Sequence, residues 1–404
     1  MAATETGVWD LQQVRDKQLA GEWEYTSSEG LYTWGDNGVG RLGHNNQTKY
    51  SSPTQVPGSW SKVFITGSGN QKYLLLSKGS GTLWGVGESY EGALGLNTGE
   101  LGGVWQVSSP VQIGTDTTWS NAVGGENMTI ATKTDGTLWM WGDNTYGGLG
   151  ANLAGGIPYQ KRSSPIQVGT DTTWSTNIAN GQGAAWAIKT NGTLWAWGNN
   201  QQYAALGLNQ YGPGTNYSSP VQVGTNTTWS SLGAGSGQGG AVAAFKNDGT
   251  LWVWGRNNNG QLGQNSINSP SSAGFSSPTQ LPGTSWASVS VGGAMLMATK
   301  TDGTLWSWGY NNFGLLGLND NIKRSSPTQI PGTTWSQVSG KQRAGYIGVA
   351  IKTDGTLWAW GNNDKGELGQ NDKTQRSSPV QIPGTWDSFD STGYNGNIAA
   401  IKSI

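Results

Sequence analysis

Residues 352–361 read Lys-Thr-Asp-Gly-Thr-Leu-Trp-Ala-Trp-Gly, and six earlier stretches of the chain share the core of this pattern. The spacing is regular, with steps of 52, 55, 56, 57, 54 and 52 residues between Leu31, Leu83, Leu138, Leu194, Leu251, Leu305 and Leu357. A repeat of this length indicates a solenoid, a propeller or an array. We therefore expect the 404 residues to form one repeat domain rather than several unrelated domains.

Each repeat predicts four β-strands. In the third repeat these are residues 117–123, 129–133, 137–141 and 163–168, separated by turn residues. Asp-Gly or Asn-Gly between apolar runs is a strong hairpin signal, because both central residues must tolerate a positive φ. The dipeptide precedes the third strand in five repeats, at Asp135, Asn191, Asp248, Asp302 and Asp354.

The third strand of each repeat is apolar on both faces. Alternation along a strand directs Trp139 and Trp141 to one face and Leu138 and Met140 to the other. A sheet with two apolar faces must be covered on both sides, which blades packed face to face around an axis achieve. The pattern predicts an all-β protein, a seven-bladed β-propeller of four-stranded antiparallel blades.

The two ends of the chain carry complementary parts of one repeat. Residues 397–402 match a second strand but stop before the third, and residues 29–35 supply a third strand without a second. We expect these strands to pair and to close the ring, which removes the exposed edges of a linear array.

The first 25 residues differ from the repeats and are interpreted as a separate leader, with the propeller spanning 26–404. Asp10 and Gln13 have the spacing of a capping box, and Trp9 and Val14 that of a hydrophobic staple. The pattern predicts a short helix over 11–20, which packs either on the propeller or on another subunit. As a docking segment it offers the apolar side chains Trp9, Leu11, Val14, Leu19 and Trp23.

The composition excludes several classes of function. Charged residues make up 12% of the chain and the net charge is −1, so the electrostatic footprint of a nucleic-acid-binding protein is missing. The sequence has no cysteine for disulfides or thiolate chemistry and no apolar run long enough to cross a membrane. We expect neither nucleic acid binding nor membrane insertion, and the N-terminus has no signal-peptide pattern.

No catalytic, cofactor or metal constellation emerges from the motifs. His44 is the only histidine, so a Ser-His-Asp arrangement would depend on it alone. The stretch 38–43 satisfies a dinucleotide fingerprint on paper but opens no helix, and it is interpreted as a turn between strands. Asn and Asp at 362–364 recur in most repeats, which favours turn residues over calcium ligands. The sequence predicts a non-enzymatic protein without cofactor or metal.

Four consecutive repeats carry longer loops than the others. Between the Leu-Gly turn and the Ser-Ser-Pro segment, repeats two to five have 12, 12, 10 and 12 residues, whereas repeats one, six and seven have 7. Loops at the same place in each repeat rise from one face of the ring. They carry the candidate binding residues, for a protein or a glycan, Trp105, Tyr159, Lys161, Arg162, Tyr211, Tyr217 and Phe275. The alternative is that these insertions fold back over the blades.

The pattern Asp-Gly-Thr-Leu-Trp-x-Trp-Gly-x-Asn-x-x-Gly-x-Leu-Gly, followed by Ser-Ser-Pro-x-Gln, resembles the regulator of chromosome condensation repeat family. The resemblance covers about residues 26–404 and implies a seven-bladed propeller closed by strand exchange between the chain ends. Function varies within this family. Its eukaryotic founder is a guanine-nucleotide exchange factor bound to chromatin, whereas bacterial relatives include a β-lactamase inhibitor and adhesins.

This sequence departs from the eukaryotic pattern at several points. The histidine that the family usually has seven residues before each turn is replaced by Met128, Ala184, Ala241, Met295 and Ile347. The chain also has no basic tail and no insertion suited to a small GTPase. These differences argue against nucleotide exchange.

The leader is similar to segments of phage virion proteins in which a short Trp-Leu-Gln motif precedes a repetitive body. This resemblance predicts a phage tail or fibre-associated component, located in the virion, that mediates subunit assembly or host attachment. Its partners would be other virion proteins or a host-surface ligand, and the leader would also support a homo-oligomer. The alternative is a bacterial protein-interaction module, acting as an inhibitor or an adhesin.

Overall fold

The computed structural model describes the chain from residue 30 to residue 402 with internal gaps. The described ranges are 30–65, 72–89, 91–98, 105–125, 127–152, 161–181, 183–201, 203–234, 240–267, 274–341, 346–391 and 397–402. The predicted leader helix and its docking residues lie outside these ranges. Within the described part of the chain, no helix has the length and apolarity of a membrane span.

The structure confirms a ring of seven four-stranded antiparallel blades, each listed here from its innermost to its outermost strand. Blade 1 contains β27 (Ser388–Ser391), β28 (Asn397–Lys402), β1 (Gly30–Gly35) and β2 (Tyr50–Val56). Blade 2 contains β3 (Lys62–Ile65), β4 (Lys72–Ser77), β5 (Leu83–Ser89) and β6 (Trp105–Gln112). Blade 3 contains β7 (Trp119–Gly124), β8 (Met128–Lys133), β9 (Leu138–Gly142) and β10 (Arg162–Gln167).

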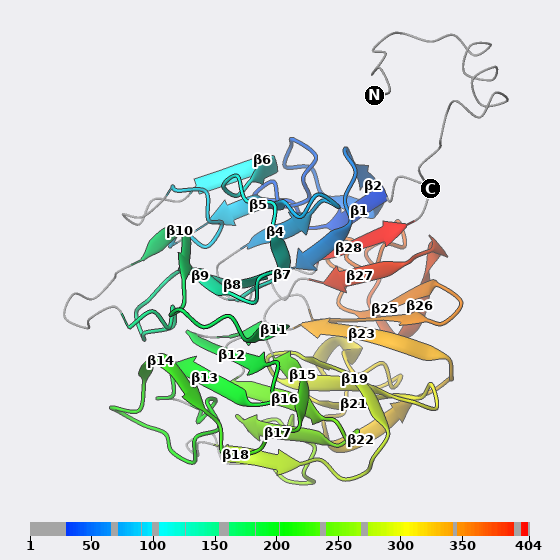
Figure 1. The fold of residues 1–404 in the computed structure, drawn as a ribbon. Helices are drawn as coiled ribbons and strands as arrows, with labels where there is room; N and C mark the ends of the chain where they lie inside the picture. The colour runs from blue at the N-terminus through cyan, green and yellow to red at the C-terminus, as the bar shows by residue number, and fades with distance from the viewer. Residues whose placement is uncertain are drawn as a thin grey trace, which may run out of the picture.

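The remaining blades follow the same order, as Figure 1 shows. Blade 4 contains β11 (Trp174–Asn180), β12 (Ala184–Lys189), β13 (Leu194–Gly198) and β14 (Tyr217–Gln222). Blade 5 contains β15 (Trp229–Ala234), β16 (Ala241–Lys246), β17 (Leu251–Gly255) and β18 (Phe275–Gln280). Blade 6 contains β19 (Trp286–Val291), β20 (Met295–Lys300), β21 (Leu305–Gly309), the 3-10 turn η1 (Asn312–Gly314) and β22 (Arg324–Ile330). Blade 7 contains β23 (Trp335–Lys341), β24 (Ile347–Lys352), β25 (Thr356–Gly361) and β26 (Arg376–Thr385).

Antiparallel pairing gives the ring two different sides. The Asp-Gly turns between the second and third strands lie on one side, together with the connections that lead from each fourth strand into the next blade. We call this the turn side. The loops between the third and fourth strands lie on the opposite side, which we call the loop side. The long loops of blades 2 to 5 therefore share one side, as the sequence predicts.

Pairing between the chain ends closes the ring as predicted. Strand β28 pairs with β1 over its whole length, from Gly30 opposite Lys402 to Gly35 opposite Asn397. Figure 1 shows the red strand β28 directly beside the blue strand β1. Because one blade contains both ends of the chain, no blade edge is left at a break in the ring.

A buried tryptophan joins each blade to the one before it at six of the seven junctions. The tryptophan before the last glycine of the third strand donates its Nε1–H to the backbone carbonyl of the residue that directly precedes Leu-Gly in the turn of the preceding blade. We call this bond the tryptophan latch. The donors, all fully buried, are Trp34, Trp141, Trp197, Trp254, Trp308 and Trp360.

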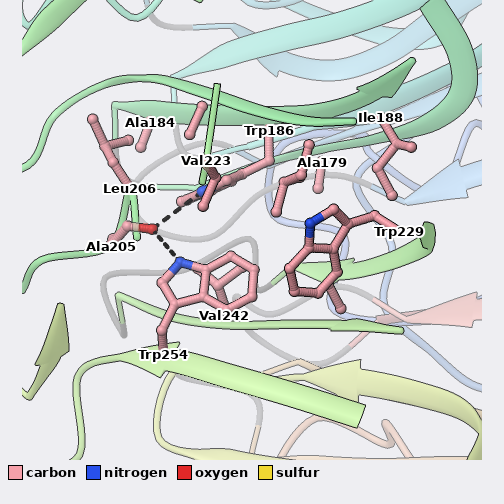
Figure 2. Close-up of a cluster of buried hydrophobic side chains, with 13 residues drawn as sticks. Ala179, Ala184, Trp186, Ile188, Ala205, Leu206, Val223, Trp229, Val242 and Trp254 are labelled. Atoms are coloured by element: carbon pink, nitrogen blue, oxygen red, sulfur yellow. Dashed lines mark hydrogen bonds between the residues drawn. The ribbon is translucent and has the colours of Figure 1, made fainter. Parts of the chain in front are cut away.

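Figure 2 shows the latch between blades 4 and 5, where the indole nitrogen of Trp254 lies 2.8 Å from the carbonyl oxygen of Ala205. Trp186, which falls outside the repeat pattern, donates to the same oxygen at 3.1 Å. At the junction of blades 1 and 2 the tryptophan is replaced by Val86. Blade 1 instead contains the buried Arg41, which binds Asp36 at 3.0 Å and Asn397 at 3.2 Å.

The glycine that ends each latch turn has two reasons to be glycine. Gly150, for example, has a φ of +64°, which L side chains rarely adopt. A Cβ atom at this position would also lie 2.6 Å from Nε1 of Trp197. The turn therefore reaches the next blade only because this side chain is absent.

Replacing Trp34 by Phe tests the latch that closes the ring. Its Nε1 lies 3.1 Å from the carbonyl oxygen of Glu367, which the Phe variant leaves buried without this donor. We expect urea unfolding to show a loss of about 2 to 4 kcal/mol, from the unsatisfied carbonyl and the smaller side chain. The control is Trp84→Phe, since Trp84 is half-buried and binds Thr82 of its own hairpin. Equal losses in both variants would contradict the role of the latch.

Glu367 makes the same junction sensitive to pH. Its side chain is 1% exposed, and burial raises the pKa of its carboxyl from 4.5 to about 7. The folded state therefore binds this proton more tightly than the unfolded state, so stability falls as the pH rises from about 4.5 and levels off above about 7. The loss is at most about 3 kcal/mol.

Glu367→Gln should remove this pH dependence, as measured by the free energy of unfolding at pH 5 and pH 8. Gln261 already occupies the equivalent position of blade 5, where its Oε1 accepts the backbone N–H of Asn259 at 2.8 Å. Glu367 accepts the backbone N–H of Lys365 in the same way at 2.7 Å. We expect the variant to be more stable than the wild type at pH 8 only. If the free energy of unfolding rose between pH 5 and pH 7 in the wild type but not in Glu367→Gln, the raised pKa of Glu367 would be contradicted.

Candidate protein-binding face on the loop side

The loop side is built on one recurring turn, braced by an asparagine. Asn311 accepts the backbone N–H of Leu316 at 2.7 Å and donates to the carbonyls of Asp320 and Ile322 at 3.0 and 3.1 Å. Asn363 makes the equivalent bond to Leu368 at 2.9 Å. These asparagines therefore hold the backbone of the loops. Among the described residues, no group of three or more His, Asp or Glu side chains is placed to hold a metal ion.

Two other motifs also serve the turn of blade 1. In the stretch 38–43, the N–H of Gly40 binds the carbonyl of Asn37 at 3.0 Å, and the N–H of Gly43 binds that of Gly40 at 3.1 Å. This geometry is a pair of tight turns. Nε2 of His44 lies 2.9 Å from the Thr33 hydroxyl, and burial lowers the pKa of its imidazole. Its ring packs edge-on against Tyr50. These contacts are those of a residue that stabilises the turn.

The predicted loop residues of blades 2 and 3 are only partly described. Trp105 is the first residue of β6, paired with Ser89, and its side chain lies outside the described part of the structure, as does all of Tyr159. Lys161 forms an ion pair with Glu91 of the preceding blade. The Arg162 guanidinium donates to the carbonyl of Lys161 at 3.1 Å.

The predicted loop residues of blades 4 and 5 have different environments. Tyr217 and Phe275 begin β14 and β18, and both are half-buried against the clusters between blades. The Tyr217 hydroxyl accepts a hydrogen bond from the Gln210 amide. Tyr211 is 55% exposed. Of the predicted aromatics whose side chains are described, Tyr211 is the one that faces solvent.

A second set of aromatic side chains occupies the loop side. An aromatic residue occupies the same turn position in three blades, namely Tyr146 before Gly147 in blade 3, Tyr203 before Ala204 in blade 4 and Phe313 before Gly314 in blade 6. Each reaches the start of the next blade's second strand. A Cβ on Gly183 would lie 2.9 Å from the Tyr146 ring, and one on Gly240 would lie 2.6 Å from Tyr203. These aromatics therefore bridge neighbouring blades at their loop-side ends.

The set extends across blades 6 and 7 as a stack of rings. The ring centre of Phe313 lies 5.0 Å from that of Tyr346, and the ring centre of Tyr346 lies 6.0 Å from that of Tyr310. Burial raises the pKa of the Tyr310 hydroxyl, so this group stays neutral. We call Tyr146, Tyr203, Tyr310, Phe313 and Tyr346 the loop-side aromatic row.

Two cations lie over rings of this row. The Arg256 guanidinium is 4.6 Å from the centre of the Tyr203 ring, and Lys323 Nζ is 5.1 Å from that of Tyr310. Lys323 also binds the Asn259 side chain at 3.2 Å. Cation–π contacts of this kind hold long cationic side chains in place on a surface. The row therefore combines aromatic area with positioned positive charge.

Exposed apolar side chains accompany the row in blades 5 and 6. Ile322 is 63% exposed, Ile267 58% and Phe313 38%. Phe313 also has a φ of +63°, which is unusual for a bulky residue. Strained and exposed aromatics are found at functional surfaces more often than in stable scaffolds. In blades 3 and 6 the sequence signal is an aromatic residue in Asn-x-x-Gly, immediately before the glycine.

The comparisons with known proteins fit this geometry. The family model described as regulator of chromosome condensation (RCC1) repeat matches residues 28–68, 248–299, 302–340 and 354–389. The chain is a seven-bladed propeller in which these four stretches match the RCC1 repeat. Proteins with propellers of this type generally have binding or regulatory roles.

Known proteins resemble this chain at low sequence identity. The chain is 28% identical over 253 residues to the mitochondrial RCC1 domain-containing protein RUG3 of Arabidopsis thaliana, and it spans 55% of that protein's length and 61% of its own. Human WBSCR16 superposes with a TM-score of 0.77 at 19% identity, covering 93% of this chain and 99% of that one. Saccharomyces cerevisiae Prp20p gives a TM-score of 0.75 at 18% identity, covering 93% and 92%. These likenesses establish the shared fold.

Phe313→Gly tests whether this aromatic serves stability. Glycine removes the positive-φ strain of about 1 to 2 kcal/mol and loses a ring contact of about the same size. We expect the free energy of unfolding to change by less than about 1 kcal/mol. Leu316→Ala, in the buried part of the same turn, should cost about 2 to 5 kcal/mol. An equally large loss for Phe313→Gly would show that Phe313 is a core residue.

Proposed function

We propose that this protein is a non-enzymatic propeller that binds another protein through its loop side. The observation that carries the proposal is the loop-side aromatic row, with Arg256 and Lys323 held over its rings and Phe313 and Ile322 exposed. Tyrosine, phenylalanine and arginine are enriched at protein interfaces, and rigid placement lowers the entropy cost of binding. The long loops of blades 2 to 5 extend the same surface.

The relatives give this proposal a precedent. The yeast protein Prp20p is described as binding Gsp1p and histones, and yeast RCC1 (Prp20) has been solved with Kap60 bound. Those partners belong to the yeast protein. For this chain we infer only the general use of the ring as a protein-binding scaffold. Nucleotide exchange is not proposed, because the family histidines are replaced at five positions of the sequence.

We further propose that the binding partner belongs to a phage particle, and that residues 1–25 dock the protein to the tail or fibre. This assignment depends on the leader's resemblance to virion segments, and the comparisons add nothing to it. The alternative is a bacterial inhibitor or adhesin that uses the same loop side. Immunodetection in purified particles distinguishes these two, since a bacterial module would be absent from them.

The loop-side proposal is tested on a partner identified by cross-linking in the native extract and then purified. We expect Phe313→Ala and Ile322→Ala each to raise the Kd by at least about tenfold, as substitutions at interface hot spots do. Combined replacement of Trp105, Tyr159 and Tyr211 by Ala tests in the same assay whether the long loops of blades 2 to 5 contribute to binding. The matched control is Thr172→Ala, an exposed residue of the turn side. Binding that survives both sets of loop-side changes would contradict the proposal.

A further inference from the structure

A groove of about 430 Å3 lies at the junction of blades 4 and 5, where the connection from β14 to β15 passes on the turn side. Its apolar walls are formed by Leu208, Val223, Trp229, Trp252 and Pro278. Lys246 is the one charged residue among those that line it. The groove is therefore an aromatic cleft with a single ammonium group, and Lys246, the last residue of β16, lies at its turn-side end, away from the loop-side aromatic row.

In two other repeats the lysine at this position holds a carboxylate. Lys133 and Lys189 are its equivalents in blades 3 and 4, and each lies over two tryptophan rings as Lys246 does. Both bind a carboxylate three residues before the inner tryptophan. The Lys133–Asp116 distance is 2.8 Å and the Lys189–Asp171 distance is 2.6 Å. The lysine bond is the largest cause that lowers the pKa of Asp171, to about 2.

Blade 5 has Asn226 at the place of this aspartate. In blade 4, one oxygen of Asp171 accepts the Thr173 hydroxyl at 2.6 Å while the other reaches Lys189. In blade 5, the Asn226 oxygen accepts the Thr228 hydroxyl at 2.7 Å, so the turn is preserved. The remaining end of the amide is an NH2 group, which donates instead of accepting. Blade 5 thus keeps the lysine and the turn and replaces the carboxylate oxygen with a second donor.

We propose that this groove binds a carboxylate carried on a small apolar body. The ligand carboxylate takes the place that Asp171 fills in blade 4, accepting from Lys246 Nζ and from the Asn226 amide. The apolar body lies along the tryptophan-lined wall beside Trp252. A groove of about 430 Å3 suits a ligand of small-molecule size.

The electrostatic setting of Lys246 supports this assignment. Burial lowers the pKa of its ammonium, and the exposed Asp248 in the adjacent turn offsets only part of that effect. A partly desolvated cation gains more from a bound anion than a fully hydrated one does. The two tryptophan faces, with ring centres 5.0 and 3.7 Å from Nζ, orient the ammonium without neutralising it.

Calorimetry with phenylacetate and its neutral analogue phenylacetamide tests the site on the full-length protein. We expect one phenylacetate to bind per chain, and phenylacetamide to bind at least about tenfold more weakly. Asn226→Asp installs the pair found in blades 3 and 4, so it should fold normally and reduce phenylacetate binding by at least about tenfold. Lys246→Met should also reduce phenylacetate binding by at least about tenfold, and thermal unfolding checks that each variant is folded.

The carboxylate has two natural sources, a free organic acid or the C-terminus of a peptide. Acetyl-Ala-Phe with a free carboxylate, compared with its amide, distinguishes the peptide source from phenylacetate. Binding of either acid that is lost in Asn226→Asp supports the proposal. Equal binding of acid and amide, unchanged binding in Asn226→Asp, or no binding of either acid would overturn it.

Discussion

The tryptophan latch is the interaction on which the ring depends. One indole N–H per junction, within 3.1 Å of a carbonyl in the preceding blade, fixes the distance and the rotation between blades at six of seven junctions. Its geometry explains the rest of the repeat. The turn must present a carbonyl, so an asparagine braces it from inside. The turn must also approach the indole closely, so its last residue is glycine. Because Trp34 makes this bond to Glu367 across the chain ends, the final junction is built like the internal ones.

Much of this fold could be predicted from the sequence. The seven copies of the repeat predicted seven blades. Alternation in residues 137–141 predicted that both faces of each blade are covered. The incomplete repeats at the two ends predicted the pairing of β1 with β28. The latch itself could not be predicted, because strand periodicity says which face a side chain occupies but not which atom of another blade it meets. Trp186 illustrates this point, since it lies outside the repeat pattern and still binds the Ala205 carbonyl.

The candidate site was less predictable. Loop length correctly indicated which side of the ring varies, but it could not separate aromatics that face solvent, such as Tyr211, from those that pack inward, such as Tyr217 and Phe275. The loop-side aromatic row was missed because Tyr146, Tyr203 and Phe313 occupy an ordinary turn position, in repeats with short loops as well as long ones. Its other members, Tyr310 and Tyr346, lie next to the ends of ordinary strands. The groove of blade 5 was missed for a related reason, since Asn226 differs from Asp171 by one group and only the structure shows what that group binds. In both places function is proposed where a repeat departs from its neighbours, while the shared residues build the scaffold.

Hydrogen exchange of the indole N–H groups, followed by NMR, tests the central claim that latches hold the blades as one cooperative ring. The account predicts that the indole protons of Trp34, Trp141, Trp197, Trp254, Trp308 and Trp360 exchange together and only through global unfolding. Half-buried indoles such as that of Trp139, which bond within their own hairpin, should exchange faster. Fast exchange at Trp34, or separate exchange rates for the six latches, would contradict the account.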